Sequence, residues 1–225
     1  MAYQTTAELL AGFKFYAMRP DTDESITDAT IYVLLSQGQE KVFELLAAHV
    51  PEVLYGAPTK LATADSGYNY TFPTAVFPYG AVEIRASRTG ELLIPGTEWS
   101  EADYTWEGDS IRIPNGKART FADGPYGRWI AAPTDISASQ EPTLKPASAR
   151  SLILFYALYL WAERGGGMNQ VDPNRFLGIY QSLWSGDPRI PGDAGILATL
   201  KRQGYGQGMA ALNVQGPWYK SINNG

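Results

Sequence analysis

The sequence of 225 residues contains no cysteine and a single histidine, His49. The lack of cysteine excludes disulfide bonds and thiolate metal sites. A zinc site or a Ser-His-Asp triad would have to use His49, but this residue lies at the end of a predicted helix, where the negative end of the helix dipole favours it. We therefore interpret His49 as structural and expect no metal and no cofactor.

Charged residues are also scarce, at 18% of the chain against the roughly 25% that is typical of globular domains. The net charge is −5, and the nearest approach to a basic cluster is the pair Lys201-Arg202. A protein that grips the DNA backbone needs a basic patch. We therefore expect no sequence-specific binding of nucleic acid.

No hydrophobic run is long enough to span a bilayer. The most apolar stretch, residues 152–162, is about half of the ~20 residues that a membrane helix needs. The first residues lack the basic region and the apolar run of a signal peptide. These absences predict a protein that is made in the cytoplasm and has no membrane partner.

Motifs for catalysis are missing too, since the chain has neither a Gly-x-Ser-x-Gly elbow nor a Gly-Lys-Ser or Gly-Lys-Thr phosphate loop. Paired carboxylates could still hydrolyse a sugar. They lie, however, near a helix start or in turn-rich sequence, where acids serve for capping and solvation. We expect no enzyme, and a small hydrolase that uses Glu101, Asp103 and Asp109 is the less favoured alternative. The two acidic groups are Asp21, Asp23, Glu24 and Asp28, and Glu98, Glu101, Asp103, Glu107 and Asp109.

Helical periodicity predicts two helices near the N-terminus. Thr5 and Glu8 have the spacing of a capping box in front of a helix over residues 6–16. Ser25 is expected to cap a longer helix that ends at Val50. Gly38, in the middle of that helix, weakens it by about 1 kcal/mol relative to Ala and marks a candidate break.

Three further helices are predicted in the last third of the chain. The one that begins at Pro146 and Ser148 and ends at Gly165-Gly166-Gly167 is apolar nearly all round, so it should be the central helix. Asp172-Pro173 caps the next, which Gly186 closes. A third covers residues 193–203.

Between these helices the composition changes to Pro, Gly, Thr and Tyr with short β-favouring runs. The fold class is therefore α+β: a helical bundle with a β-rich insertion and an extended C-terminal arm. The expected strands are 81–86, 91–94, 104–106, 110–114 and 128–130, with turns at 107–109 and 115–116. The expected parts are 1–50 and 143–204 for the helical core, 51–142 for the β-rich insertion and 205–225 for the arm.

The arm has large apolar groups without periodicity, behind a glycine-rich hinge formed by Gly204, Gly206 and Gly208. A segment this short cannot fold alone. It must pack either on its own domain or on a neighbour, and we favour a neighbour. The residues that we expect to dock on a partner are Met209, Leu212, Val214, Trp218, Tyr219 and Ile222.

The order of the parts is a long capped helix over 25–50, a β-rich excursion, two helices with the sequences ARSLILFYALY at 149–159 and PNRFLGIY at 173–180, and an extended tail over 204–225. This layout resembles the head-to-tail adaptor (connector) proteins of tailed bacteriophages. The pair of helices, with its Phe176-x-x-x-Tyr180 motif, looks like the pair that closes an adaptor's helical bundle. The insertion of about ninety residues is larger than in the smallest members.

The resemblance implies a homododecameric ring under the portal of the filled head, located in the virion. Its C-terminal segments would dock on the portal protein, and its β-rich part would meet a tail component. DNA would pass through the central channel in passive contact, without an active site, and the acidic balance suits such a channel. The alternative within structural proteins is a tail-completion, nozzle or fibre-associated protein.

Overall fold

The computed structural model describes residues 3–17, 26–63, 69–71, 82–94, 103–107, 110–113, 124–166, 171–190 and 192–205, and the chain is of the α+β class. It divides into two compact units. The helical unit contains residues 1–53 and 133–205, and the β unit contains residues 54–132 among its described part. The helical unit is thus assembled from both sides of the β-rich segment.

The first two helices begin at side-chain caps. Helix α1 (Thr6–Tyr16) has the predicted capping box between Thr5 and Glu8. Helix α2 (Asp28–His49) begins at Thr27, whose hydroxyl accepts a hydrogen bond from the Thr30 N–H at 3.2 Å. The prediction of Ser25 as the cap is therefore wrong, because Thr27 performs this role. Ser25 itself lies outside the described residues.

The predicted break at Gly38 is also wrong, because α2 continues through this residue. Gly38 is buried where α2 crosses helix α4 (Arg150–Glu163). A Cβ atom at position 38 would lie 2.6 Å from the carbonyl oxygen of Ile153. Glycine is present here because it permits the close approach of two helix backbones.

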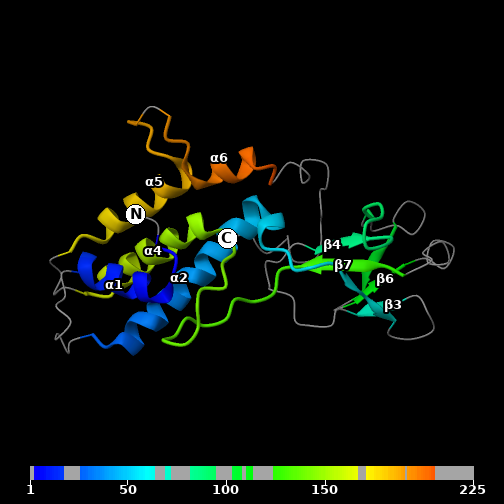
Figure 1. The fold of residues 1–225 in the computed structure, drawn as a ribbon, viewed down its shortest axis with the longest axis horizontal. Coiled ribbons are helices and arrows are strands. Elements are labelled where there is room, and N and C mark those ends of the chain that lie inside the picture. The colour runs from blue at the N-terminus through cyan, green and yellow to red at the C-terminus, as the bar shows by residue number, and fades with distance from the viewer. Residues whose placement is uncertain are drawn as a thin grey trace. The chain divides into compact units, whose positions relative to one another are not determined.

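Helix α4 is the central helix, as its all-round apolar sequence predicts. It follows the short 3-10 helix η2 (Ala147–Ala149) and contacts α1, α2 and helix α5 (Pro173–Ser185). Figure 1 shows α5 on one side of α4 and α1 with α2 on the other. Edge-on aromatic contacts reinforce this packing, with ring centroids of Phe13 and Trp161 at 5.9 Å.

The predicted start of α5 and its predicted stop are confirmed. The Asp172 carboxylate accepts a hydrogen bond from the Asn174 N–H at 2.9 Å, and Pro173 occupies the first turn. Gly186 then ends the helix with a φ of 86°. Helix α6 (Gly195–Arg202) packs against α5.

The β unit is entered through the 3-10 helix η1 (Pro51–Val53) and contains two antiparallel sheets. The first has the strand order β1-β7-β4 and the second has the order β2-β3-β6-β5. The chain passes from the first sheet to the second at Leu61, between β1 and β2. The strands are β1 (Thr59–Lys60), β2 (Ala62–Thr63), β3 (Asn69–Thr71), β4 (Val82–Arg85), β5 (Thr105–Glu107), β6 (Ser110–Arg112) and β7 (Tyr126–Trp129).

One apolar core serves both sheets. Ile84 and Trp129 come from the first sheet, and Tyr70 and Ile111 from the second. Burial raises the pKa of Tyr70, and it raises that of Tyr104 in the same core further. A phenol with a raised pKa stays neutral, as a buried ring should.

Four predicted strands correspond to β4, β5, β6 and β7, and β5 and β6 pair as the turn at 107–109 indicates. The stretch 91–94 forms only an isolated bridge, between Leu92 and Arg85. Strands β1, β2 and β3 were not predicted. They have two or three residues each, which is too short for a recognisable alternation of apolar and polar residues. The predicted turn at 115–116 lies outside the described residues.

The insertion is shorter than the predicted 51–142, since residues 51–53 and 133–142 belong to the helical unit. Side chains of α2 hold this segment. The buried Gln39 amide donates to the Thr134 carbonyl at 2.7 Å and accepts from the Thr143 N–H at 2.8 Å, and the Ser36 hydroxyl accepts from the Ile136 N–H at 2.9 Å. These contacts join positions about a hundred residues apart, so no local sequence pattern could reveal them.

Candidate interaction surfaces

The predicted docking arm lies outside the described residues, as do Gly206 and Gly208 of the predicted hinge. Gly204 is described and ends α6. It has a φ of 92°, its N–H donates to the Lys201 carbonyl at 3.0 Å, and the Tyr205 N–H donates to the Leu200 carbonyl at 3.2 Å. This pair of bonds is a left-handed glycine cap. The helical unit therefore has a defined end at Tyr205, and the docking role of the arm stays a prediction.

The residues considered for catalysis are not brought together in the described part of the chain. His49 ends α2, where its exposed ring lies 5.5 Å from that of Trp184. Asp28 forms an ion pair with Lys14 at 3.0 Å. Asp103 accepts a hydrogen bond from the Ile94 N–H at 2.8 Å. Each acid thus has a structural contact, and the other acidic side chains of the two groups lie outside what the structure describes.

Two general findings concern the described residues only. No three His, Cys, Asp or Glu side chains among them lie close enough together to hold a metal ion. No helix among them is long and apolar enough to cross a membrane.

The described part of the helical unit contains a groove between α5 and α6. Its volume is about 760 Å³, which lies within the range of ligand pockets. Aliphatic side chains line part of it, including Ile179, Leu183 and Ile190. The charged residues in its lining are of both signs: Arg175, Arg189 and Arg202 together with Asp187 and Asp193.

The connection from α5 to α6 forms one wall of this groove. Hydrogen bonds between its own residues hold it together. Asp193 accepts hydrogen bonds from the N–H groups of Asp187 at 2.9 Å and Gly195 at 3.2 Å, and these bonds hold the pKa of its carboxyl below the usual range. Gly186 and Gly195 both have positive φ, and a Cβ on Gly195 would lie 2.3 Å from the Gly186 nitrogen. The wall is therefore built by backbone contacts that only glycine permits.

Sequence reasoning missed this groove. Its basic residues are separated by fourteen and thirteen positions in the chain, at 175, 189 and 202, so they form no local cluster. The available signal was the pair Gly186 and Gly195 around an Asp-Pro turn, which indicates a tight connection between two amphipathic helices.

One large apolar side chain near the end of α1 is exposed. Phe15, in the last turn of α1, is 75% exposed. Its ring touches only the edge of Tyr16 among the described aromatic contacts, at 5.3 Å between centroids. Apolar side chains that are exposed singly are normal on folded proteins, so Phe15 by itself does not define a binding site.

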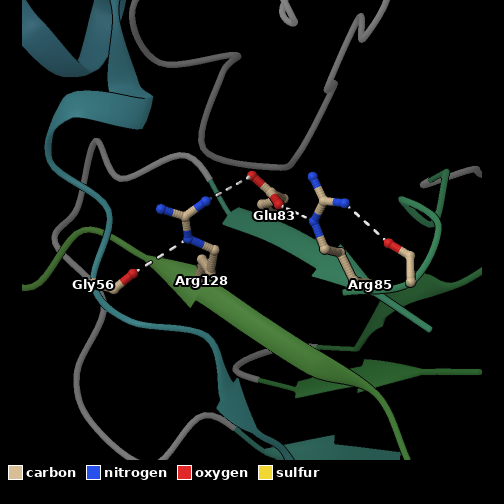
Figure 2. Close-up of polar contacts among 5 residues, drawn as sticks. Gly56, Glu83, Arg85 and Arg128 are labelled. Carbon is tan, nitrogen blue, oxygen red and sulfur yellow. Dashed lines mark hydrogen bonds and ion pairs between the residues drawn. The ribbon is translucent and has the colours of Figure 1, made fainter. Parts of the chain in front are cut away.

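A polar network ties together the first sheet of the β unit (Figure 2). Glu83 on β4 forms ion pairs with Arg85 and, at 3.8 Å, with Arg128 on β7. The Arg128 guanidinium also donates to the Gly56 carbonyl at 3.2 Å and lies over the Tyr55 ring, 5.3 Å from its centroid. The network thus fixes the segment that enters the β unit, which is a structural role.

A Glu83→Gln substitution is expected to lower the free energy of unfolding of the β unit by about 1–2 kcal/mol, because two arginines lose their charged acceptor. The partly exposed guanidiniums keep the effect from being larger. Urea unfolding followed by tryptophan fluorescence would measure it. Glu91→Gln is the matched control, because Glu91 is exposed; an equal effect of both changes would contradict the role of the network.

No protein-family model matches the chain, and no curated protein matches its sequence. The surfaces described above, together with the order of the parts along the chain, are therefore the basis for a functional proposal.

Proposed function

We propose that the protein is a ring-forming adaptor of a tailed bacteriophage particle. In this role it joins the portal of the filled head to the tail and forms part of the channel through which DNA passes. The observation that carries the proposal is the order of the units: the β unit enters the chain between α2 and α4 of the helical unit, and residues 206–225 follow the capped end of α6.

The properties of the units support this role. An adaptor must contact two different partners and its own copies, which requires separate surfaces on one chain. The extension behind Tyr205 offers six large apolar side chains for a groove on the portal, and the β unit offers a separate body for a tail component. The net charge of −5 suits a channel that must release DNA.

Removal of residues 206–225 tests the proposal. This truncation keeps Gly204 and Tyr205, so the cap of α6 is preserved. We expect the truncated protein to keep its circular dichroism spectrum and its thermal unfolding, and to lose at least tenfold in affinity for portal rings, because its apolar anchors are gone. Co-sedimentation with purified portal rings would measure the loss.

A full-length control separates apolar anchoring from the mere length of the arm. Trp218→Ser with Tyr219→Ser should reproduce the loss, whereas Asn223→Ser with Asn224→Ser should not. Unfolding of the truncated protein would contradict the proposal, because it would show that the arm completes its own domain. A full-length trimer or hexamer by mass photometry, without portal binding, would favour a tail-completion, nozzle or fibre-associated protein instead.

A further inference from the structure

We infer that the β unit is one closed barrel and that Asp103 is the residue that closes it. The two sheets are then halves of one structure, and neither keeps an open edge for a strand of another chain. A partner of the β unit must therefore contact side chains on its outer surface. The inference concerns how this unit meets any partner, so it does not rest on the adaptor role.

On one side of the unit, a single strand passes from the first sheet into the second. This bent strand (residues 59–63) consists of β1, which pairs with β7, and β2, which pairs with β3. Leu61 lies between the two halves, and its N–H donates to the Pro125 carbonyl at 2.9 Å. Continuous main chain thus joins the two sheets here, as at the corners of packed sheets where a strand changes from one sheet to the other.

On the other side, the first sheet continues beyond β4 by one short segment. The chain turns after β4, and residues 91–93 pair with it in antiparallel direction. The Ala86 N–H donates to the Glu91 carbonyl at 3.0 Å, and the Leu93 N–H donates to the Ile84 carbonyl at 2.8 Å. This segment lies next to β4 on the side away from β7.

Asp103 connects this segment to β5, the outer strand of the second sheet. Its N–H donates to the Ile94 carbonyl at 2.9 Å, and its carboxylate accepts from the Ile94 N–H at 2.8 Å. Both polar groups of the Ile94 main chain are thus bonded to Asp103. Residues 91–94 and 103–107 therefore act together as a second strand that serves both sheets, which we call the closing strand.

The directions of the strands agree with a closed barrel. In order around the unit, the strands are the bent strand, β3, β6, the closing strand, β4 and β7. Every neighbouring pair is antiparallel. Alternating directions meet without conflict only when the number of strands is even, and here it is six. Each of these strands has a neighbour on both sides, and a closed barrel has no edge strand.

The interior of the barrel is filled by side chains. Each of the six strands contributes at least one apolar residue to the common core, and none of these is more than 8% exposed. They are Leu61, Tyr70, Ile111, Leu93 and Tyr104, Ile84, and Trp129. A small barrel packed in this way encloses no channel or ligand cavity. The outer side chains are therefore what the unit presents to a partner.

Hydrogen exchange of the natural full-length chain tests the closure. The amides of Leu61, Leu93, Ile94 and Asp103 should exchange at least a hundredfold more slowly than unprotected amides, because each donates a hydrogen bond within the barrel. Mass spectrometry with single-residue resolution would measure the rates. Rapid exchange at Ile94 and Asp103 would show two open sheets and overturn the barrel.

The same measurement at a hundredfold lower protein concentration separates closure from strand addition. Bonds within one chain should give the same exchange rates at both concentrations. Protection of Ile94 or Asp103 that appears only at the higher concentration would show that these amides pair with another chain. In strand addition a partner's main chain bonds to an open sheet edge, so that result would overturn the inference.

Variants of Asp103 test its own role. Asp103→Ala removes the side-chain acceptor, so the Ile94 amide should exchange at least tenfold faster. Asp103→Asn keeps an acceptor oxygen, so it should restore slow exchange. Glu91→Ala is the control, because the exposed Glu91 contributes only its main-chain carbonyl to the barrel, and it should leave the rate unchanged. Equal Ile94 exchange in Asp103→Ala and the natural chain would show that the Asp103 carboxylate does not close the barrel.

Discussion

A Gly38→Ala substitution is expected to lower the free energy of unfolding of the helical unit by about 1–3 kcal/mol. The new methyl group would lie 2.6 Å from the carbonyl oxygen of Ile153. This atom belongs to the backbone of α4, so it cannot rotate away as a side chain would. Helices α2 and α4 would have to separate, and the apolar side chains that they share would lose contact.

The sign of the change in the free energy of unfolding separates this packing effect from helix propensity. Helix propensity alone gives alanine an advantage of about 1 kcal/mol over glycine. The control is Gly178→Ala on α5, where an added Cβ meets no atom within 4 Å. We expect this change to stabilise the protein. Thermal and urea unfolding would measure both variants, and stabilisation by Gly38→Ala would show that α2 and α4 do not pack closely at this point.

A Gln39→Glu substitution is expected to destabilise the helical unit by about 2–4 kcal/mol at pH 7. The Gln39 side chain is buried, and its Nε2 donates to the Thr134 carbonyl at 2.7 Å. A carboxylate there would lose the donor, bring two acceptors together and bury a charge. Only the bond from the Thr143 N–H to the other oxygen would persist.

The pH dependence of this variant follows from the same contacts. Burial and the facing carbonyl would raise the pKa of the new carboxyl in the folded state above its unfolded value of about 4.3. The unfolded state then binds fewer protons over the interval between the two values, so the loss of stability should shrink as the pH falls through it. Urea unfolding at pH 7 and pH 5 would measure the difference from the natural chain.

Gln37→Glu is the matched control, because it makes the same chemical change two residues earlier on α2. The Oε1 atom of Gln37 accepts a hydrogen bond from Arg164 at 3.0 Å, so a carboxylate would gain an ion pair at an exposed site. We expect a change within about 0.5 kcal/mol. Equal destabilisation by both variants would indicate that Gln39 does not hold the segment between Thr134 and Thr143.

The helical unit has surface features that the sequence alone did not indicate. The sequence directs attention to the apolar residues behind Gly204. The structure adds a preformed groove with three arginines and an exposed phenylalanine on another side of the same unit.

The sequence by itself determined the features that depend on near neighbours. The capping box of Thr5 and Glu8, the Asp172-Pro173 start of α5 and the glycine that ends α4 are all local hydrogen-bond patterns. The central position of α4 followed from its composition, because a helix that is apolar all round must be covered on several sides. These features require no knowledge of distant residues.

Only the tertiary structure decided the role of Gly38, the end of the insertion at 132 and the groove between α5 and α6. Each depends on groups that are far apart in the chain and come together only after the elements pack. By helix propensity alone, Gly38 is expected to weaken α2. Its role becomes clear only when the backbone of α4 packs against it. Arg175, Arg189 and Arg202 likewise form no cluster in the sequence, and only the packing of α5 and α6 brings them to the rim of one groove.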